Sequence, residues 1–320
     1  MIKSLIMITR AYALPMSIFS WLVAFAYGVS CSGNILYGFL ALIGICLAHL
    51  GANMFDDYID YNSLKRIDEN GNVFLVNAQQ GKCEYLLNNT ITPNQLLLSS
   101  FLCFGLAICV GIFFISKIGI SIFIIMLLSG LAGILYPIAG KFRLCETLIA
   151  LIYGPLLFGG VSCVMNGVYD WKTLIVCLPT MLLTVNLLYT DTMLDYDLDK
   201  SEDKKTIANM FSRKNSLNCH KLLLILVYLS LFLVYWNTKT ISIFITLITI
   251  PMAINLISSM KLYIDDKTKL PKRRFYEGPM ENWDIILQEG SASFMMRMYQ
   301  ARNLMIFFST IYSATLFLGY

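Results

Sequence analysis

Nine hydrophobic segments, several of them near the ~20 residues needed to cross a bilayer, constrain this chain more than any other feature. Because 57% of its 320 residues are hydrophobic and only 14% are charged, the chain lies far outside the composition of soluble proteins. The segments 118–137 and 221–237 carry the weakest signal, so the sequence predicts eight or nine helices in one all-α membrane domain spanning residues 1–320. The predicted spans are 13–32, 35–54, 96–116, 118–137, 145–165, 173–193, 221–237, 241–260 and 303–320.

The distribution of basic residues predicts the orientation of these helices. With the N-terminus inside the cell, the outer loops contain only Lys117, Lys172 and Lys239 of the 24 Lys and Arg residues. By the positive-inside rule, this asymmetry favours a cytoplasmic N-terminus. The net charge of +4 then reflects a basic inner rim, and not a surface for nucleic acid. The three long loops expected on the cytoplasmic side are 61–95, 200–220 and 261–302.

The last of these loops contains mixed apolar and polar residues from Trp283 to Met298, a pattern that favours an interfacial helix. In the first loop, Thr92 and Pro93 are typical of a helix cap followed by the first helical turn.

Two groups of aspartates lie at the inner ends of hydrophobic segments. The first contains Asp56 and Asp60, and the second contains Asp191, Asp195 and Asp199. A step of four residues turns an α-helix by only ~40°, so the members of each group share one helix face. Like charges at this spacing repel by roughly 0.2–0.5 kcal/mol per pair. Mg²⁺ suits such a site, because it binds a few carboxylates and fills its remaining positions with phosphate and water.

These five aspartates are therefore the candidate metal ligands. Together they are expected to hold two Mg²⁺ ions bridged by a diphosphate, whose departure the metals assist by neutralising its charge. Asp57 and Asp197 point off the two faces and are weaker candidates. Solvated helix caps are the alternative for either group alone, but they explain poorly why two groups of equal spacing lie on one side.

Other residues of the inner side are candidates for substrate contacts, although positive-inside bias is an alternative explanation for any single basic residue. His49 and His220 are isolated in the sequence and are assigned no role. The tyrosines placed to stabilise an allylic cation by cation–π contact are Tyr58, Tyr136 and Tyr153. The candidates for binding a diphosphate and assisting its departure are Lys82, Lys141, Arg143, Lys204 and Lys205.

The motifs resemble those of the UbiA-type intramembrane prenyltransferases, most closely the menaquinone-type branch that prenylates dihydroxynaphthoate. The family's first motif falls on Asn53, Asp56 and Asp60, with Asp56 where the family often has Asn. The resemblance extends over about residues 10–260. It departs from the family pattern in the charged stretch 65–69 and in the length of segment 261–302.

The family's second motif matches Asp191, Asp195 and Asp199, and residues 204–208 are similar to the Lys-Arg-Thr-Leu-Ala segment that follows it. The resemblance implies nine helices around a central cavity, with Mg²⁺ at its cytoplasmic mouth. Asn53 is expected to support the metal ligands and to bind substrate. The resemblance also implies transfer of a prenyl group from a polyprenyl diphosphate to a small aromatic acceptor within the lipid bilayer.

A different class of function remains as the alternative: a cation-coupled transporter or membrane scaffold that uses the aspartates for transport or assembly. Such a protein would explain acidic residues at the membrane edge and the weak twofold repetition of a helix–carboxylate–loop unit. It does not readily explain why both groups lie at one side and not near the midplane. A CDP-alcohol phosphotransferase is disfavoured because its Asp-Gly…Ala-Arg pattern is absent.

Overall fold

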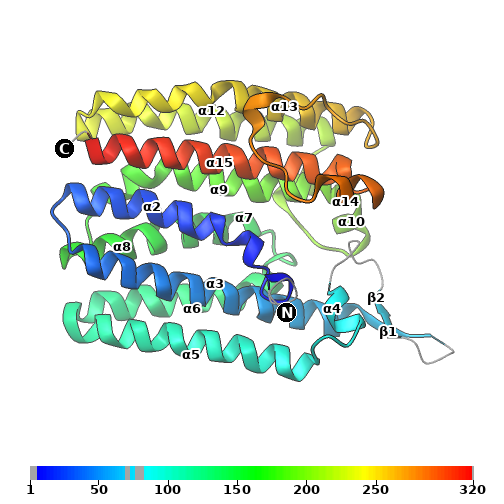
Figure 1. Ribbon diagram of the computed structural model, residues 1–320, viewed down its shortest axis with the longest axis horizontal. Coiled ribbons are helices and arrows are strands. Elements are labelled where there is room, and N and C mark those ends of the chain that lie inside the picture. The colour runs from blue at the N-terminus through cyan, green and yellow to red at the C-terminus, as the bar shows by residue number, and fades with distance from the viewer. Residues whose placement is uncertain (1–5, 69–72, 76–82, 319–320) are drawn as a thin grey trace.

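The computed structural model describes residues 6–68, 73–75 and 83–318. Among these residues, nine helical segments are long and apolar enough to cross a membrane, which confirms the all-α fold and the higher of the two expected counts. The segments lie side by side and form one bundle (Figure 1). The helices that build them are η1 (Ala11–Ala13), α2 (Pro15–Ser30), α3 (Ile35–Leu64), α5 (Pro93–Ile118), α6 (Ile120–Ala139), α7 (Cys145–Leu151), η2 (Ile152–Leu156), α8 (Leu157–Asn166), α9 (Lys172–Leu194), α12 (Arg213–Thr238), η3 (Ile241–Thr249), α13 (Ile250–Asp265) and α15 (Ala292–Leu318).

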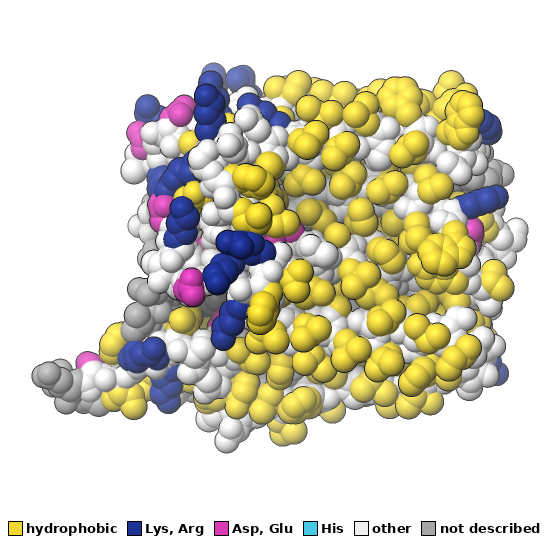
Figure 2. All heavy atoms as spheres, turned by 180° about the vertical axis from the view of Figure 1, so that it is seen from behind, with side chains coloured by type: hydrophobic (Ala, Val, Ile, Leu, Met, Phe, Trp, Pro, Cys, Tyr) yellow, Lys and Arg dark blue, Asp and Glu magenta, His cyan; other side chains and the backbone are white. Residues whose placement is uncertain are grey.

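Short elements gather at one end of the bundle (Figure 1). The two strands pair antiparallel, with Lys65 opposite Leu75 and Ile67 opposite Val73, so part of the loop after α3 is a hairpin. We call this the polar end, because Lys, Arg, Asp and Glu side chains concentrate here while the bundle surface beside it is apolar (Figure 2). The short elements are β1 (Lys65–Ile67), β2 (Val73–Leu75), α4 (Glu84–Leu87), α10 (Tyr196–Ser201), α11 (Ile207–Met210) and α14 (Trp283–Gln288).

Helix α3 is longer than the membrane requires. Its 30 residues correspond to about 45 Å at 1.5 Å per residue, against a hydrocarbon core of about 30 Å. The helix therefore continues well past the expected end of its span at residue 54 and carries Asp56 and Asp60 on its last turns. Each long helix has one of its ends at the polar end of the bundle. The bundle therefore gathers at this end the ends of helices that are distant in sequence.

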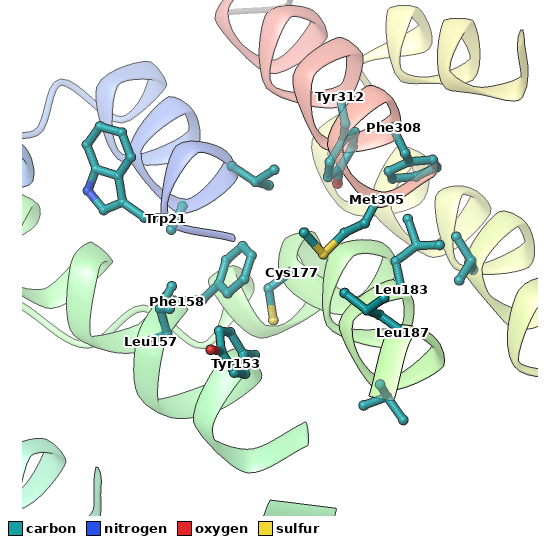
Figure 3. Close-up of a cluster of buried hydrophobic side chains, with 14 of the residues drawn as sticks. Trp21, Tyr153, Leu157, Phe158, Cys177, Leu183, Leu187, Met305, Phe308 and Tyr312 are labelled. Atoms are coloured by element: carbon teal, nitrogen blue, oxygen red, sulfur yellow. The ribbon is translucent and has the colours of Figure 1, made fainter. Parts of the chain in front are cut away.

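The core lies where α2, α8, α9 and α15 meet (Figure 3). Phe158 of α8, Cys177 of α9 and Phe308 of α15 are buried there, and Cys177 acts as a small hydrophobic residue. The hydroxyl of Tyr312 donates to the backbone oxygen of Val176 at 2.9 Å, which ties α15 to α9. The cavity lies beside this core, toward α3, α5 and α6, and α8 and α9 contribute residues to both.

The start of α5 agrees with the sequence. Thr92 is the N-cap residue, and its hydroxyl accepts from the backbone N–H of Gln95 at 3.3 Å, while Pro93 occupies the first turn. The cap prediction is confirmed.

The last helix begins eleven residues earlier than expected, at Ala292 in place of residue 303. The prediction of one interfacial helix within 283–298 is therefore wrong. The first part of this segment is the short helix α14, and the second part is the beginning of α15. The beginning of α15 was missed in the sequence because it contains polar residues that are typical of a loop. Arg297 is fully buried, and its guanidinium donates to the backbone oxygens of Ser259 and Lys269, each at 3.0 Å.

We expect Arg297→Met to lower the free energy of unfolding by about 2–4 kcal/mol, because buried carbonyl oxygens lose their donors. The measurement is unfolding of the purified protein in detergent. Lys269→Ala is the control, since its Nζ lies 3.8 Å from Asp266 in an exposed pair and should contribute less than about 1 kcal/mol. Equal effects of the two substitutions would contradict the structural role of Arg297.

Candidate active site

Three aspartates meet at the end of α3 and form the first carboxylate cluster. Asp56, Asp57 and Asp60 can each place one carboxylate oxygen within 4.8 Å of the other two. Asp57, which the sequence ranked as a weaker candidate, belongs to this cluster and is buried. Oxygen atoms at this spacing suit a hard divalent cation such as Mg²⁺.

Arg10 compensates part of the negative charge of the first cluster. Its Nη1 lies 3.2 Å from Asp56 and 3.1 Å from Asp57. Burial by itself would lower the pKa of Arg10, but the charges of Asp57 and Asp56 outweigh it and hold this pKa above its usual value. Asn53 fixes the segment that carries this arginine, because its side-chain amide donates to the backbone oxygens of Thr9 and Arg10, both at 3.4 Å.

Tyr85 of α4 binds the same cluster from the other side. Its hydroxyl donates to Asp57 Oδ2 at 2.6 Å, and the Cys83 thiol lies 3.6 Å from the Asp57 backbone oxygen. Burial and the adjacent Asp57 carboxylate both raise the pKa of Tyr85, so it acts as a hydrogen-bond donor and stays neutral. The hydrogen bond therefore anchors the segment after the hairpin to the carboxylates of α3.

The three aspartates of the second motif, Asp191, Asp195 and Asp199, lie where α9 passes into α10, and we call them the second carboxylate cluster. The helix is interrupted at Asp195, but backbone hydrogen bonds from Asp195 to Asp191 (2.9 Å) and from Asp199 to Asp195 (2.8 Å) keep the three on successive turns. Asp199 is buried and its Oδ1 lies 3.0 Å from Lys204 Nζ. Burial would lower the pKa of Lys204, but Asp199 reverses the effect and raises it, so Lys204 stays protonated.

One large cavity, about 2550 Å³ in volume, connects the two clusters. Its polar end is lined by carboxylates and lysines, and its deeper wall by apolar residues of α3, α5, α6 and α8 such as Phe104, Met126 and Val161. Such a cavity suits an amphiphile whose anionic head lies at the mouth and whose apolar part lies inside.

The cavity brings together most of the residues predicted from the sequence. Arg143 and Tyr58 are outside its lining as described, and Asp199 contributes through its pair with Lys204. Lys82 lies outside the described residues. The predicted residues that line the cavity are Asn53, Asp56, Asp60, Tyr136, Lys141, Tyr153, Asp191, Asp195, Lys204 and Lys205.

Sequence reasoning missed Arg10 and Tyr85, which lie 46 and 28 residues from their aspartate partners. A signal for Arg10 was present: it is a lone arginine directly before the first span, at the end where the aspartates gather. Tyr85 had no such signal, because its contact depends on how the chain returns through α4.

Comparison with known proteins shows similarity over almost the whole chain. The model of the UbiA prenyltransferase family matches residues 16–283. The UbiA prenyltransferase domain-containing protein 1 of Danio rerio is 24% identical over 236 residues, which cover 72% of this chain and 67% of that protein.

Solved structures share the fold at low sequence identity. A structure described for digeranylgeranylglyceryl phosphate synthase has a TM-score of 0.61 at 16% identity, covering 99% of this chain and 98% of that one. A UbiA homologue from Archaeoglobus fulgidus bound to GPP and Mg²⁺ has a TM-score of 0.59 at 14% identity, with 95% and 99% covered. A UbiA homologue from Aeropyrum pernix K1 without ligand has a TM-score of 0.58 at 10% identity, with 92% and 96% covered.

We expect Tyr85→Phe to lower the free energy of unfolding by about 1.5–3 kcal/mol, because a buried carboxylate loses a hydrogen bond. Unfolding in detergent measures the change, with Tyr12→Phe as the control because Tyr12 is exposed. In an Asp57→Asn background the cost of Tyr85→Phe should shrink, since the two groups interact. Full additivity of the two substitutions would refute the interaction.

Proposed function

Because this chain belongs to the UbiA prenyltransferase family, we propose that it transfers a prenyl group from a polyprenyl diphosphate to an aromatic acceptor, with the diphosphate held by Mg²⁺ between its two carboxylate clusters. It is a prenyltransferase and an integral membrane protein. The observation that carries the proposal is that Lys204 and aspartates of both clusters line one cavity whose deeper wall is largely apolar; these aspartates are Asp56, Asp57, Asp60, Asp191 and Asp195.

The proposed metal ligands are Asp56, Asp60, Asp191 and Asp195, with Asn53 in support and Asp57 beside them. Asp199 belongs to the same proposed set and also holds Lys204 in place. Mg²⁺ bound here would neutralise the negative charge that develops on the leaving diphosphate. The homologue from Archaeoglobus fulgidus, described as bound to GPP and Mg²⁺ and in another structure to DMAPP and Mg²⁺, supports this assignment.

The proposed diphosphate contacts are basic residues at the same mouth. Lys141, Lys204 and Lys205 line the cavity there, and Lys205 is fixed because its backbone N–H donates to the Gly140 oxygen. These cations stabilise the charge that accumulates on the diphosphate as it departs. Lys82 and Arg143 remain candidates from the sequence.

In the proposed reaction, the bond between the first prenyl carbon and the diphosphate oxygen breaks, and its electron pair leaves with the diphosphate. The ring of the acceptor attacks the allylic cation, forms the new carbon–carbon bond and loses a proton. The apolar wall keeps water from capturing the cation. Tyr136, which lines the cavity close to both clusters, is proposed to stabilise the cation through its ring.

The acceptor and the orientation are also proposals. The matches to the menaquinone-type motifs make a dihydroxynaphthoate the first acceptor to test. The gathering of Lys and Arg at the polar end supports placing that end, with the clusters, on the cytoplasmic side (Figure 2).

We expect Asp195→Asn to reduce prenyl transfer at least a hundredfold, a loss that corresponds to about 2.7 kcal/mol in the barrier. The assay is release of diphosphate and formation of prenylated product from geranylgeranyl diphosphate and 1,4-dihydroxy-2-naphthoate with Mg²⁺, beside an EDTA control. Asp197→Asn is the matched control, because Asp197 is exposed and paired with Arg213 and Lys267 away from the cavity. Full activity of Asp195→Asn would refute the proposed metal site.

Geranylgeranyl diphosphate with Mg²⁺ should raise the melting temperature of the wild-type protein, since a ligand that binds only the folded state stabilises it. At a hundredfold excess over the dissociation constant, the expected stabilisation is about 2.7 kcal/mol. A cation transporter has no reason to respond in this way. The absence of both a shift and diphosphate release would therefore favour the transporter alternative.

A further inference from the structure

Three polar side chains meet on the cavity wall away from the carboxylate clusters. The Ser17 hydroxyl lies 2.6 Å from His49 Nδ1, and the Tyr153 hydroxyl lies 3.2 Å from the same nitrogen. The Ser17 and Tyr153 oxygens are 3.3 Å apart, so the three groups form a closed set, which we call the His49 triad. All three residues line the cavity, although they come from α2, α3 and the segment after α7.

The backbone that carries Tyr153 is itself irregular. Between α7 and α8, residues Ile152–Leu156 form a single π-helical turn that contains Pro155. Single π-helical turns occur frequently at functional sites, where they redirect a side chain that a regular helix would place elsewhere. The irregular turn and the hydrogen bond to His49 are separate observations, and both concern Tyr153 on the cavity wall.

The surroundings of the triad are mostly apolar. On the cavity side of α3, the residues next to His49 are the apolar Ile45, Ala48 and Ala52 and, one turn nearer the carboxylates, the polar Asn53. His49 precedes Asp56 by seven residues, which is two helical turns or about 10 Å deeper along α3. Polar groups in such surroundings are costly unless they are hydrogen-bonded. Within the triad, Nδ1 of His49 is hydrogen-bonded to Ser17 and Tyr153. The described hydrogen bonds of His49 involve Nδ1, so Nε2 is the ring nitrogen that remains for a ligand.

The chemistry of the two substrates decides which of them this nitrogen recognises. A prenyl chain carries no hydrogen-bonding group beyond its diphosphate, whereas an aromatic acceptor activated for attack carries a hydroxyl. In a neutral imidazole, one ring nitrogen donates and the other accepts. A hydroxyl can do both, so it pairs with Nε2 whichever proton arrangement Ser17 and Tyr153 impose on Nδ1.

We infer that the His49 triad is the subsite that binds a hydroxyl group of the aromatic acceptor, through His49 Nε2, and so positions the ring beneath the diphosphate. This inference rests on the proposed function, which supplies the acceptor class. His49 contacts the acceptor, while Ser17 and Tyr153 act as positioning residues that hold its ring.

The test compares His49→Leu with His49→Gln, whose amide reaches the region of Nε2. We expect His49→Leu to raise the KM for 1,4-dihydroxy-2-naphthoate about threefold to tenfold, the range that corresponds to one hydrogen bond. The KM for geranylgeranyl diphosphate should stay within about twofold of wild type. His49→Gln should restore much of the acceptor affinity. Ser100→Ala is the control, because Ser100 bonds the Gly51 oxygen of α3 from outside the cavity.

Acceptor analogues make the test specific for the hydroxyl. One of the two monohydroxy analogues, 1-hydroxy-2-naphthoate or 4-hydroxy-2-naphthoate, lacks the hydroxyl that His49 is proposed to bind. The wild type should bind that analogue more weakly than the dihydroxy compound, as measured by fluorescence titration. His49→Leu should bind that analogue and the dihydroxy compound equally, because the contact is already lost. A merely structural role for His49 would weaken all three ligands by the same factor, and this result would overturn the inference.

The outcomes separate the inference from the proposed function. An active wild type with an unchanged acceptor KM in His49→Leu, or with a raised KM for geranylgeranyl diphosphate alone, overturns only the inference. A wild type that neither binds nor prenylates any of the three naphthoates overturns it together with the aromatic acceptor. Failure of metal-dependent diphosphate release with every acceptor refutes the proposed function itself.

Discussion

The concentration of negative charge at one end of an apolar bundle is the constraint on which the rest of the site depends. Carboxylates that lie within a few ångströms of one another repel, and the low-polarity surroundings strengthen the repulsion. Arg10 and Lys204 supply positive charge, while Tyr85 supplies a hydrogen bond. The contacts of Arg10 and Tyr85 also tie distant segments of the chain to the end of α3. The charges that the site needs thus organise the loops around it.

The cavity separates three kinds of chemistry along its length. In the proposed function, ions and the diphosphate bind at the mouth, where the carboxylates and lysines lie. The His49 triad offers a few oriented hydrogen bonds about two turns deeper, and the remaining wall is largely apolar. This order matches the parts of an amphiphilic substrate and its acceptor, and it keeps the polar groups from drawing water into the apolar region.

The sequence predicted those features that depend on local pattern. Hydrophobic runs predicted the spans, and the four-residue spacing correctly placed Asp56 and Asp60 on one face of α3. The same reasoning ranked Asp57 too low, because rotation about a helix says nothing of the arginine and tyrosine that the fold brings to it. The beginning of α15 was missed for a similar reason: Arg297 looked like a loop residue until its partners on other segments were known. Contacts between distant parts of the chain decided each difference.

The buried polar residues of α15 have a consequence for how the protein enters its membrane. This segment is the least apolar of the nine candidate spans, and an arginine near the centre of an isolated span costs about 2.5–3.5 kcal/mol, less toward an end. Besides the Ser293 oxygen of its own helix, Arg297 donates to carbonyl groups of α13 and of the chain just after it. Insertion of α15 into the membrane is therefore coupled to its packing against the helices that precede it. The final step of biogenesis then consists of helix packing as well as insertion.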